Sequence, residues 1–65
     1  MTLGDRIAKR LSEMGISQRN LAMTVGVTEV TMSRYIKGKR IPNALILANI
    51  CRALGVKADY LLGIE

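Results

Sequence analysis

The sequence predicts an all-α domain of five short helices, as its glycines and its apolar spacing both indicate. Five of the six glycines divide the 65 residues into short segments, and glycine commonly ends helices because it adopts the left-handed conformation without steric cost. These glycines are Gly15, Gly26, Gly38, Gly55 and Gly63. Within the segments apolar residues recur at helical intervals, and no stretch alternates with the period of a strand. Because no linker or internal repeat is visible, residues 1–65 are expected to form a single domain.

The first predicted helix covers residues 2–14 and has one apolar stripe. The stripe consists of Leu3, Ile7, Leu11 and Met14. These residues share a face because three to four residues complete a helical turn. Thr2 is expected to cap the helix, and Asp5 three residues later completes a capping box. Arg6, Lys9 and Arg10 are expected to form a solvated face of this helix. We expect Asp5 to pair with Lys9 one turn further along.

Two very short helices follow, each with a natural cap. Ser17 begins the first of them, and its inner face consists of Leu21, Ala22 and Val25. Thr28 begins the second, which runs to Lys37. Such short helices rarely survive in isolation, so the pair must pack together.

The connection between these two helices has the form of a helix-turn-helix over residues 18–37. Ala22 allows the helices to cross closely, Gly26 makes the turn, and Met32 and Tyr35 are expected to face inward. Small residues at the crossing and a glycine in the turn are typical of this motif.

A basic loop and two further helices complete the chain. Pro42 cannot continue a helix, so the residues before it form a loop that contains Lys39, Arg40 and Ile41. The clearest amphipathic helix begins at Asn43, and its stripe consists of Leu47, Ile50, Cys51 and Leu54. Cys51 is expected to be a buried structural residue. A last turn, residues 58–62, offers its apolar residues Tyr60, Leu61 and Leu62 to the core.

The composition argues against an enzyme. The sequence has no histidine and one cysteine, which removes histidine acid–base chemistry, disulfide frameworks and zinc sites built from these residues. An enzyme would need a paired-carboxylate or nucleophile site, and none of the five acidic residues has an obvious partner for one. We therefore predict no catalytic residue, metal site, cofactor or small-molecule ligand. The chain has no apolar signal core and no run of about 18 apolar residues, so the expected location is the cytoplasm, away from the membrane.

The charge is positive and unevenly distributed. Ten basic residues against five acidic ones give a net charge of +5. Residues 17–43 carry five basic residues and one acidic residue, a net charge of +4, whereas the rest of the chain has a net charge of +1. A basic surface in the middle of the chain predicts a polyanionic partner.

Over nearly its whole length the chain resembles the Cro and phage-repressor domains, also called the XRE family. The resemblance is carried by SQRNLAMTVGVTEVTMSRYIKGKRIP, by ILANICRALGV and by the closing DYLLG. It implies a compact five-helix, lambda-repressor-like fold. It also implies a sequence-specific regulator of transcription, expected to be a repressor that binds double-stranded DNA through the major groove. Such a protein acts as a homodimer on a palindromic operator and is encoded by a bacterium or a phage.

The third helix offers a face suited to reading bases. At about 100° per residue, the residues opposite Met32 include Val30 and Arg34. Arginine can bind both acceptors of guanine, and valine can contact a thymine methyl. The predicted base-reading residues are Thr28, Glu29, Val30, Ser33 and Arg34. For several of them a simpler role is open: Arg34 as a phosphate contact, Glu29 as a first-turn acid that stabilises the helix, and Ser33 as a backbone contact.

Further residues are expected to hold the phosphates. They are Gln18, Arg19, Lys37, Lys39, Arg40 and Asn43. The resemblance assigns Gln18 to the start of the second helix, where the helix N-terminus also approaches the backbone. Arg19, Lys39 and Arg40 are chosen by charge and position, and each of them can instead be a solvated surface residue.

The fourth helix departs from the family pattern in a way that suggests an interface. Leu45 and Ile46 occupy usually polar positions, and exposed apolar neighbours predict a contact surface, here a dimer interface. In the alternative, Ile46 packs at the edge of the core and only Leu45 is exposed. The last helix departs too, with Lys57 in place of a capping serine.

Two other interpretations of the whole chain are open. It can be an antitoxin that blocks a toxin and regulates its own operon, or the N-terminal part of a longer phage-type repressor. A complete Cro-like protein agrees equally well with the sequence.

Overall fold

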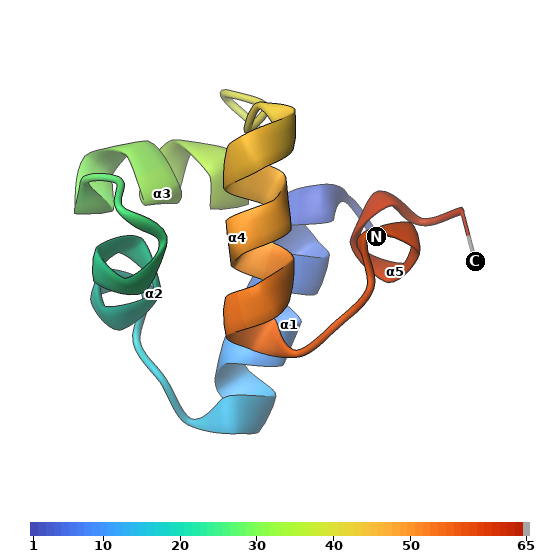
Figure 1. Cartoon of the computed structure of the whole chain (residues 1–65), viewed down its shortest axis with the longest axis horizontal. Coiled ribbons are helices and arrows are strands. Elements are labelled where there is room, and N and C mark those ends of the chain that lie inside the picture. Colours follow the sequence, from blue (N-terminus) through green and yellow to red (C-terminus); the bar gives the residue numbers. More distant parts are fainter. Residues whose placement is uncertain (65) are drawn as a thin grey trace.

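A computed structural model describes residues 1–64, which form five α-helices (Figure 1). The helices are α1 (Leu3–Met14), α2 (Gln18–Val25), α3 (Glu29–Ile36), α4 (Ala44–Leu54) and α5 (Ala58–Leu62). In Figure 1, α4 stands in the middle, with α2 and α3 on one side of it and α5 on the other. The all-α prediction and all five predicted segments are confirmed. No helix in the described part of the chain is long and apolar enough to cross a membrane.

The helices begin where the predicted caps lie. The Thr2 hydroxyl accepts from the Asp5 backbone N–H at 3.1 Å, and the Asp5 carboxylate accepts from the Thr2 backbone N–H at 2.9 Å, which completes the capping box. The side-chain oxygens of Ser17, Thr28 and Asn43 each accept from the backbone N–H three residues later and so cap α2, α3 and α4. Lys57 precedes α5 and makes no side-chain cap. Four of the five helices therefore start with a satisfied backbone donor.

The capping box also changes the pKa of the Asp5 carboxyl. Hydrogen bonds from the backbone and side chain of Thr2 lower the pKa of the Asp5 carboxyl below its ordinary value. A lowered folded-state pKa means that this stabilisation is present above about pH 4 and is lost as the carboxyl is protonated at lower pH.

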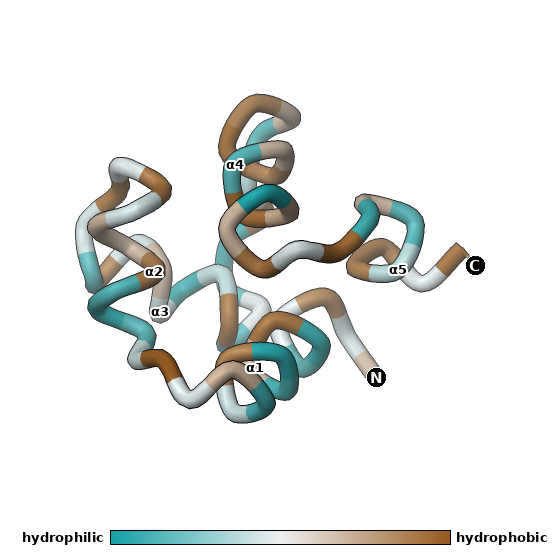
Figure 2. Tube along the Cα trace, turned by 60° about the horizontal axis from the view of Figure 1, so that its bottom comes forward, coloured by the Kyte–Doolittle hydropathy of each residue, from teal (hydrophilic) through white to brown (hydrophobic). Residues whose placement is uncertain are grey.

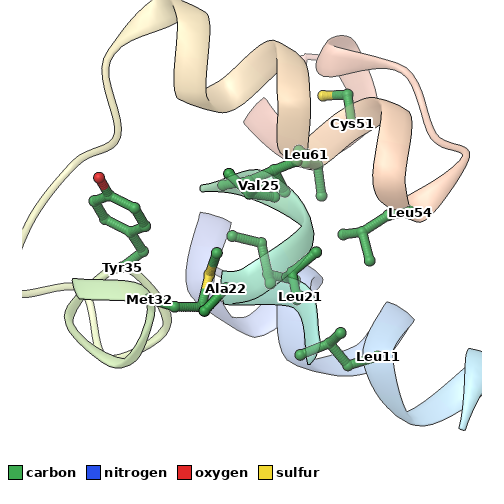
Figure 3. Close-up of a cluster of buried hydrophobic side chains, with 11 residues drawn as sticks. Leu11, Leu21, Ala22, Val25, Met32, Tyr35, Cys51, Leu54 and Leu61 are labelled. Atoms are coloured by element: carbon green, nitrogen blue, oxygen red, sulfur yellow. The ribbon is translucent and has the colours of Figure 1, made fainter. Parts of the chain in front are cut away.

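The core takes side chains from every helix (Figure 3). The largest fully buried side chains are Ile7, Leu21, Met32, Ile50, Leu54 and Leu61. The described residues include no buried polar or charged residue. Cys51 is buried as predicted, and burial raises the pKa of its thiol. It therefore stays protonated near neutral pH and acts as a small apolar residue.

Two residues predicted to cover the core are exposed instead. Met14 is 39% exposed and Leu62 is 49% exposed, so both predictions are wrong. Each lies in the last turn of its helix, just before a left-handed glycine. After α1, the chain reverses and brings Ile16 onto the core, while its backbone N–H donates to the Leu11 carbonyl. A helix that ends in this way places its apolar contact after the glycine.

Helix α3 also ends at a left-handed glycine, but the residue after this glycine is a lysine and not an apolar residue. The Lys39 backbone N–H donates to the Arg34 carbonyl at 2.9 Å across Gly38, which has φ +73°. Val27 and Val56 occupy the equivalent position after α2 and α4, and both pack against the core. Lys39 is exposed there. The turn after α3 therefore presents a cation to solvent, whereas the turns after α2 and α4 pack a half-buried valine against the core.

Arg10 connects two helices that are distant in sequence, contrary to its predicted place on a solvated face. Its Nε donates to the Leu54 carbonyl at 2.8 Å, and its Nη1 lies 3.6 Å from the Glu13 carboxylate. Arg6 is likewise engaged, with Nη1 donating to the Met1 carbonyl. The predicted pair between Asp5 and Lys9 is wrong, because the Asp5 carboxylate is used in the cap.

Replacing Arg10 by alanine is expected to destabilise the fold by about 1.5–3 kcal/mol, because the Leu54 carbonyl at the end of α4 loses a charged donor. Urea unfolding followed by circular dichroism would measure the change. Lys9→Ala, one residue away and exposed, is the control and should change stability by less than about 0.5 kcal/mol. Equal effects of the two substitutions would contradict the role given to the Arg10 contact.

Candidate nucleic-acid interface

Seven of the eleven residues predicted to contact DNA line one hollow. It has a volume of about 470 Å³ and is lined by Gln18, Glu29, Val30, Ser33, Arg34, Lys37 and Lys39. Gln18 comes from the start of α2, four residues come from α3, and the two lysines come from the turn after it. Every residue that lines the hollow belongs to the predicted set of DNA contacts.

The packing of α2 against α3 fixes this surface. Leu21, Ala22 and Val25 on α2 are buried against the core that includes Met32 of α3. Gly26 turns the chain between the two helices with φ +88°, a conformation that side chains rarely adopt. Figure 3 shows Ala22 beside Met32, where a larger residue would push the helices apart. The arrangement predicted for residues 18–37 is therefore confirmed.

The face of α3 opposite the core is the one that borders the hollow. Met32 and Tyr35 are buried, while Val30 is 61% exposed and Arg34 is exposed. Ser33 is half-buried between the two faces. The helix geometry read from the sequence thus gives the correct orientation of α3.

The remaining predicted DNA contacts lie outside the hollow. Thr28 is committed to its cap, since its Oγ1 accepts from the Thr31 N–H and lies 2.9 Å from the Thr31 hydroxyl. Asn43 uses Oδ1 to cap α4, accepting from the Ile46 N–H at 2.9 Å, which leaves its amide NH₂ as a donor. Arg19 and Arg40 are both exposed, and each follows a lining residue in the sequence. Neither of them lines the hollow itself.

The cations of the hollow are not neutralised by the protein. Within residues 1–64 the one ion pair joins Arg10 to Glu13, neither of which lines the hollow. Glu29 is the single acid among the lining residues, which include the three cations Arg34, Lys37 and Lys39. The surface can therefore attract a polyanion.

The apolar residues predicted to form an interface differ from each other in exposure. Leu45 is 78% exposed, whereas Ile46 is half-buried and packs against the core. The structure thus agrees with the alternative in which only Leu45 is free. Ile41, two residues before the Asn43 cap, is 83% exposed and is a further apolar residue of this surface, beyond the predicted pair. An isoleucine inside a basic loop is the signal that could have identified it.

Comparison with known proteins identifies relatives over most of the chain. A family model described as helix-turn-helix matches residues 7–61. An HTH-type transcriptional regulator of Bacillus subtilis, YgzD, is 31% identical over 61 residues, which is 94% of this chain and 92% of that protein. Multiprotein-bridging factor 1 of Eremothecium gossypii is 39% identical over 56 residues, covering 86% of this chain. The chain spans 37% of the length of that bridging factor.

A solved structure shows the same arrangement of helices. The c2 repressor of phage P22, in complex with a synthetic operator, matches with a TM-score of 0.94 and 32% identity. The match covers 100% of this chain and 98% of that one. The chain spans 28% of the full Repressor protein C2 of Salmonella phage P22, to which it is 35% identical over 60 residues.

Proposed function

The chain belongs to the XRE-type helix-turn-helix family of Cro and phage repressors, and we propose that it is a DNA-binding regulator of transcription that represses its target. The observation that carries the proposal is the hollow, in which predicted base readers and predicted phosphate contacts lie side by side. The similarity of the whole chain to a repressor with operator bound supports the same use of this face.

In the proposed complex α3 enters the major groove, whose width of about 12 Å admits one helix. Arg34 binds O6 and N7 of a guanine, and Val30 contacts a thymine methyl group. Glu29 accepts from a cytosine amino group, with Ser33 beside it and Thr28 at the helix start. These residues carry the sequence preference because the major groove presents a distinct pattern for each base pair.

The other predicted contacts hold the DNA backbone. They are Gln18, Arg19, Lys37, Lys39, Arg40 and Asn43. Contacts to phosphate fix the position of the protein and carry no sequence information. Gln18 stands at the N-terminus of α2, where free backbone N–H groups also favour an anion.

Lys39→Ala is expected to weaken binding to specific and non-specific duplexes alike. One fewer counterion would be released, so the slope of log K against log salt should become shallower by about 0.9. Fluorescence anisotropy at several salt concentrations measures the slope. Lys9→Ala removes the same charge from the exposed face of α1 and should leave the slope unchanged. A Lys39→Ala slope equal to that of the unaltered protein would remove Lys39 from the phosphate contacts.

We further propose that two copies bind a palindromic operator. Their recognition helices must reach major grooves about 34 Å apart, so the two-fold axis is expected beside the basic loop and the start of α4. Ile41 and Leu45 are the most exposed large apolar side chains, and both belong to this region. A domain with a total surface of 4216 Å² has little area for an interface, so the free dimer should be weak and DNA should assist its assembly.

Leu45→Glu is expected to leave the monomer folded and to abolish cooperative occupation of the two half-sites, because a charge would replace the apolar contact. Circular dichroism checks the fold, and titration of full and half operators checks cooperativity. Leu62→Glu introduces the same change on α5 and serves as the control. Unchanged cooperativity in folded Leu45→Glu protein would place the interface elsewhere.

The function itself is tested by selection from a pool of random duplexes followed by sequencing. We expect an enriched motif with dyad symmetry. A selection that enriches no motif would refute sequence-specific binding and leave only attraction to polyanions.

A further inference from the structure

A second groove lies between α1 and the segment that leads into α5. It has a volume of about 430 Å³ and is lined by Lys9, Arg10, Glu13, Val56, Lys57 and Tyr60. The first three belong to α1, and the others belong to the α4–α5 connection and to α5. None of these residues lines the hollow beside α3.

The floor of this groove is held in place by the core and by Arg10. Val56 and Tyr60 are half-buried and pack against the core, so they present an apolar surface that cannot turn away. Arg10 is fixed by its bond to the Leu54 carbonyl and by its ion pair with Glu13. Half-buried aromatic and aliphatic groups in a fixed position are typical of the central part of a protein-binding site.

The rim of the groove is basic. Lys9 and Lys57 are exposed on its two sides, and neither takes part in the one ion pair that residues 1–64 contain. Glu13, the single acid of the lining, is paired with Arg10. Two free cations therefore flank an apolar floor, and the complementary ligand combines carboxylates with an apolar side chain.

We propose that this groove is a docking site for an acidic peptide segment of a partner protein. The carboxylates of the peptide pair with Lys9 and Lys57, and an apolar side chain lies against Val56 and Tyr60. The groove is an open depression and not an enclosed cavity, which suits a peptide segment better than a buried small molecule.

The position of the groove allows it to be used while DNA is bound. Figure 1 and Figure 2 both place α5 on the side of the molecule away from α2 and α3. A peptide in the groove therefore does not compete for the face that we assign to DNA. The site would let the regulator contact another protein from the operator.

The test uses the isotopically labelled whole chain and a capped peptide, Asp-Asp-Leu-Asp-Asp-Leu, followed by amide chemical shifts. We expect the shifts of Lys9, Val56, Lys57 and Tyr60 to change most, and the same peptide with asparagine in place of aspartate to bind far more weakly. The double variant Lys9→Glu with Lys57→Glu should weaken binding about tenfold. The double variant Lys37→Glu with Lys39→Glu lowers the net charge equally and should weaken peptide binding by less than about twofold.

Several results would overturn the proposal. One is equal weakening by both double variants, which would mean attraction by net charge alone. Another is a map of shifts centred on α3, and a third is no saturable binding. Duplex DNA that perturbs the groove more strongly than the peptide does would assign the groove to nucleic acid instead.

Should the first double variant fail to fold, Lys9→Glu alone, on the exposed face of α1, should weaken peptide binding about threefold. The peptide titration contains no DNA, so a failure to bind the peptide leaves the proposed regulation of transcription untouched.

Discussion

Gly4→Ala is expected to lower the melting temperature by about 10–20 °C, corresponding to a loss of about 2–3 kcal/mol in a domain of this size. Gly4 is buried in the first turn of α1, and a Cβ built there would lie 2.0 Å from the Ile36 carbonyl oxygen and 2.6 Å from its carbon. Both are backbone atoms and cannot rotate away. The methyl group must therefore separate α1 from the end of α3.

The expected sign is opposite to the one that helix propensity gives. Alanine is favoured over glycine inside a helix by about 1 kcal/mol, so without the contact the substitution would stabilise α1. Ala8→Gly, at an exposed position of the same helix, is the control and should cost about that 1 kcal/mol. Thermal unfolding followed by circular dichroism compares the variants. A Gly4→Ala protein more stable than the unaltered chain would contradict the close approach of the two helices.

Arg34→Ala is expected to cost about 1–3 kcal/mol on the selected operator and to relax the preference at one base pair of each half-site. The reason is that Arg34 stands on the exposed face of α3, inside the hollow, where its guanidinium can bind two acceptors of one guanine. Binding to a random duplex should fall much less. Competition titrations with operators altered at single positions measure the change in preference.

Arg52→Ala removes the same side chain from α4, outside the hollow, and is the matched control. It should leave both the affinity and the base preference unchanged. If Arg34→Ala weakened operator and random duplex equally, Arg34 would be a phosphate contact, which is the simpler role that the sequence leaves open.

Local signals in the sequence were sufficient for the elements and for the face of α3. Thr2, Ser17 and Thr28 cap their helices because a side-chain oxygen reaches a backbone donor three residues later, a distance fixed by helix geometry. The outward direction of Val30 and Arg34 follows from the same geometry once Met32 is taken as buried. Neither inference requires knowledge of the neighbouring helices.

The features that sequence reasoning missed depend on contacts between distant segments. Gly4 differs from the helix-ending glycines because Ile36 lies against it, and Arg10 differs from a solvated arginine because Leu54 lies beside it. The residues next to Gly4 and Arg10 in the sequence give no indication of these partners. The groove between Lys9 and Lys57 is hidden for the same reason, since its two sides meet only when α1 and α5 pack.

The exposure of the apolar residues was predicted only in part. Met14 shares the spacing of the stripe on α1, but the turn at Gly15 gives its place on the core to Ile16. Ile46 is half-buried because it packs against the core, although it lies off the predicted apolar stripe of α4. Periodicity identifies the centre of a buried face, whereas the width of that face depends on the neighbouring helices.

The proposed place of the exposed face of α3 in the major groove can be tested by intermolecular nuclear Overhauser effects between the labelled protein and the selected duplex. We expect contacts from the Val30 methyl groups and the Arg34 side chain to base protons and thymine methyl groups of the major groove. Contacts to bases that come from α1 or α5, with none from α3, would contradict it.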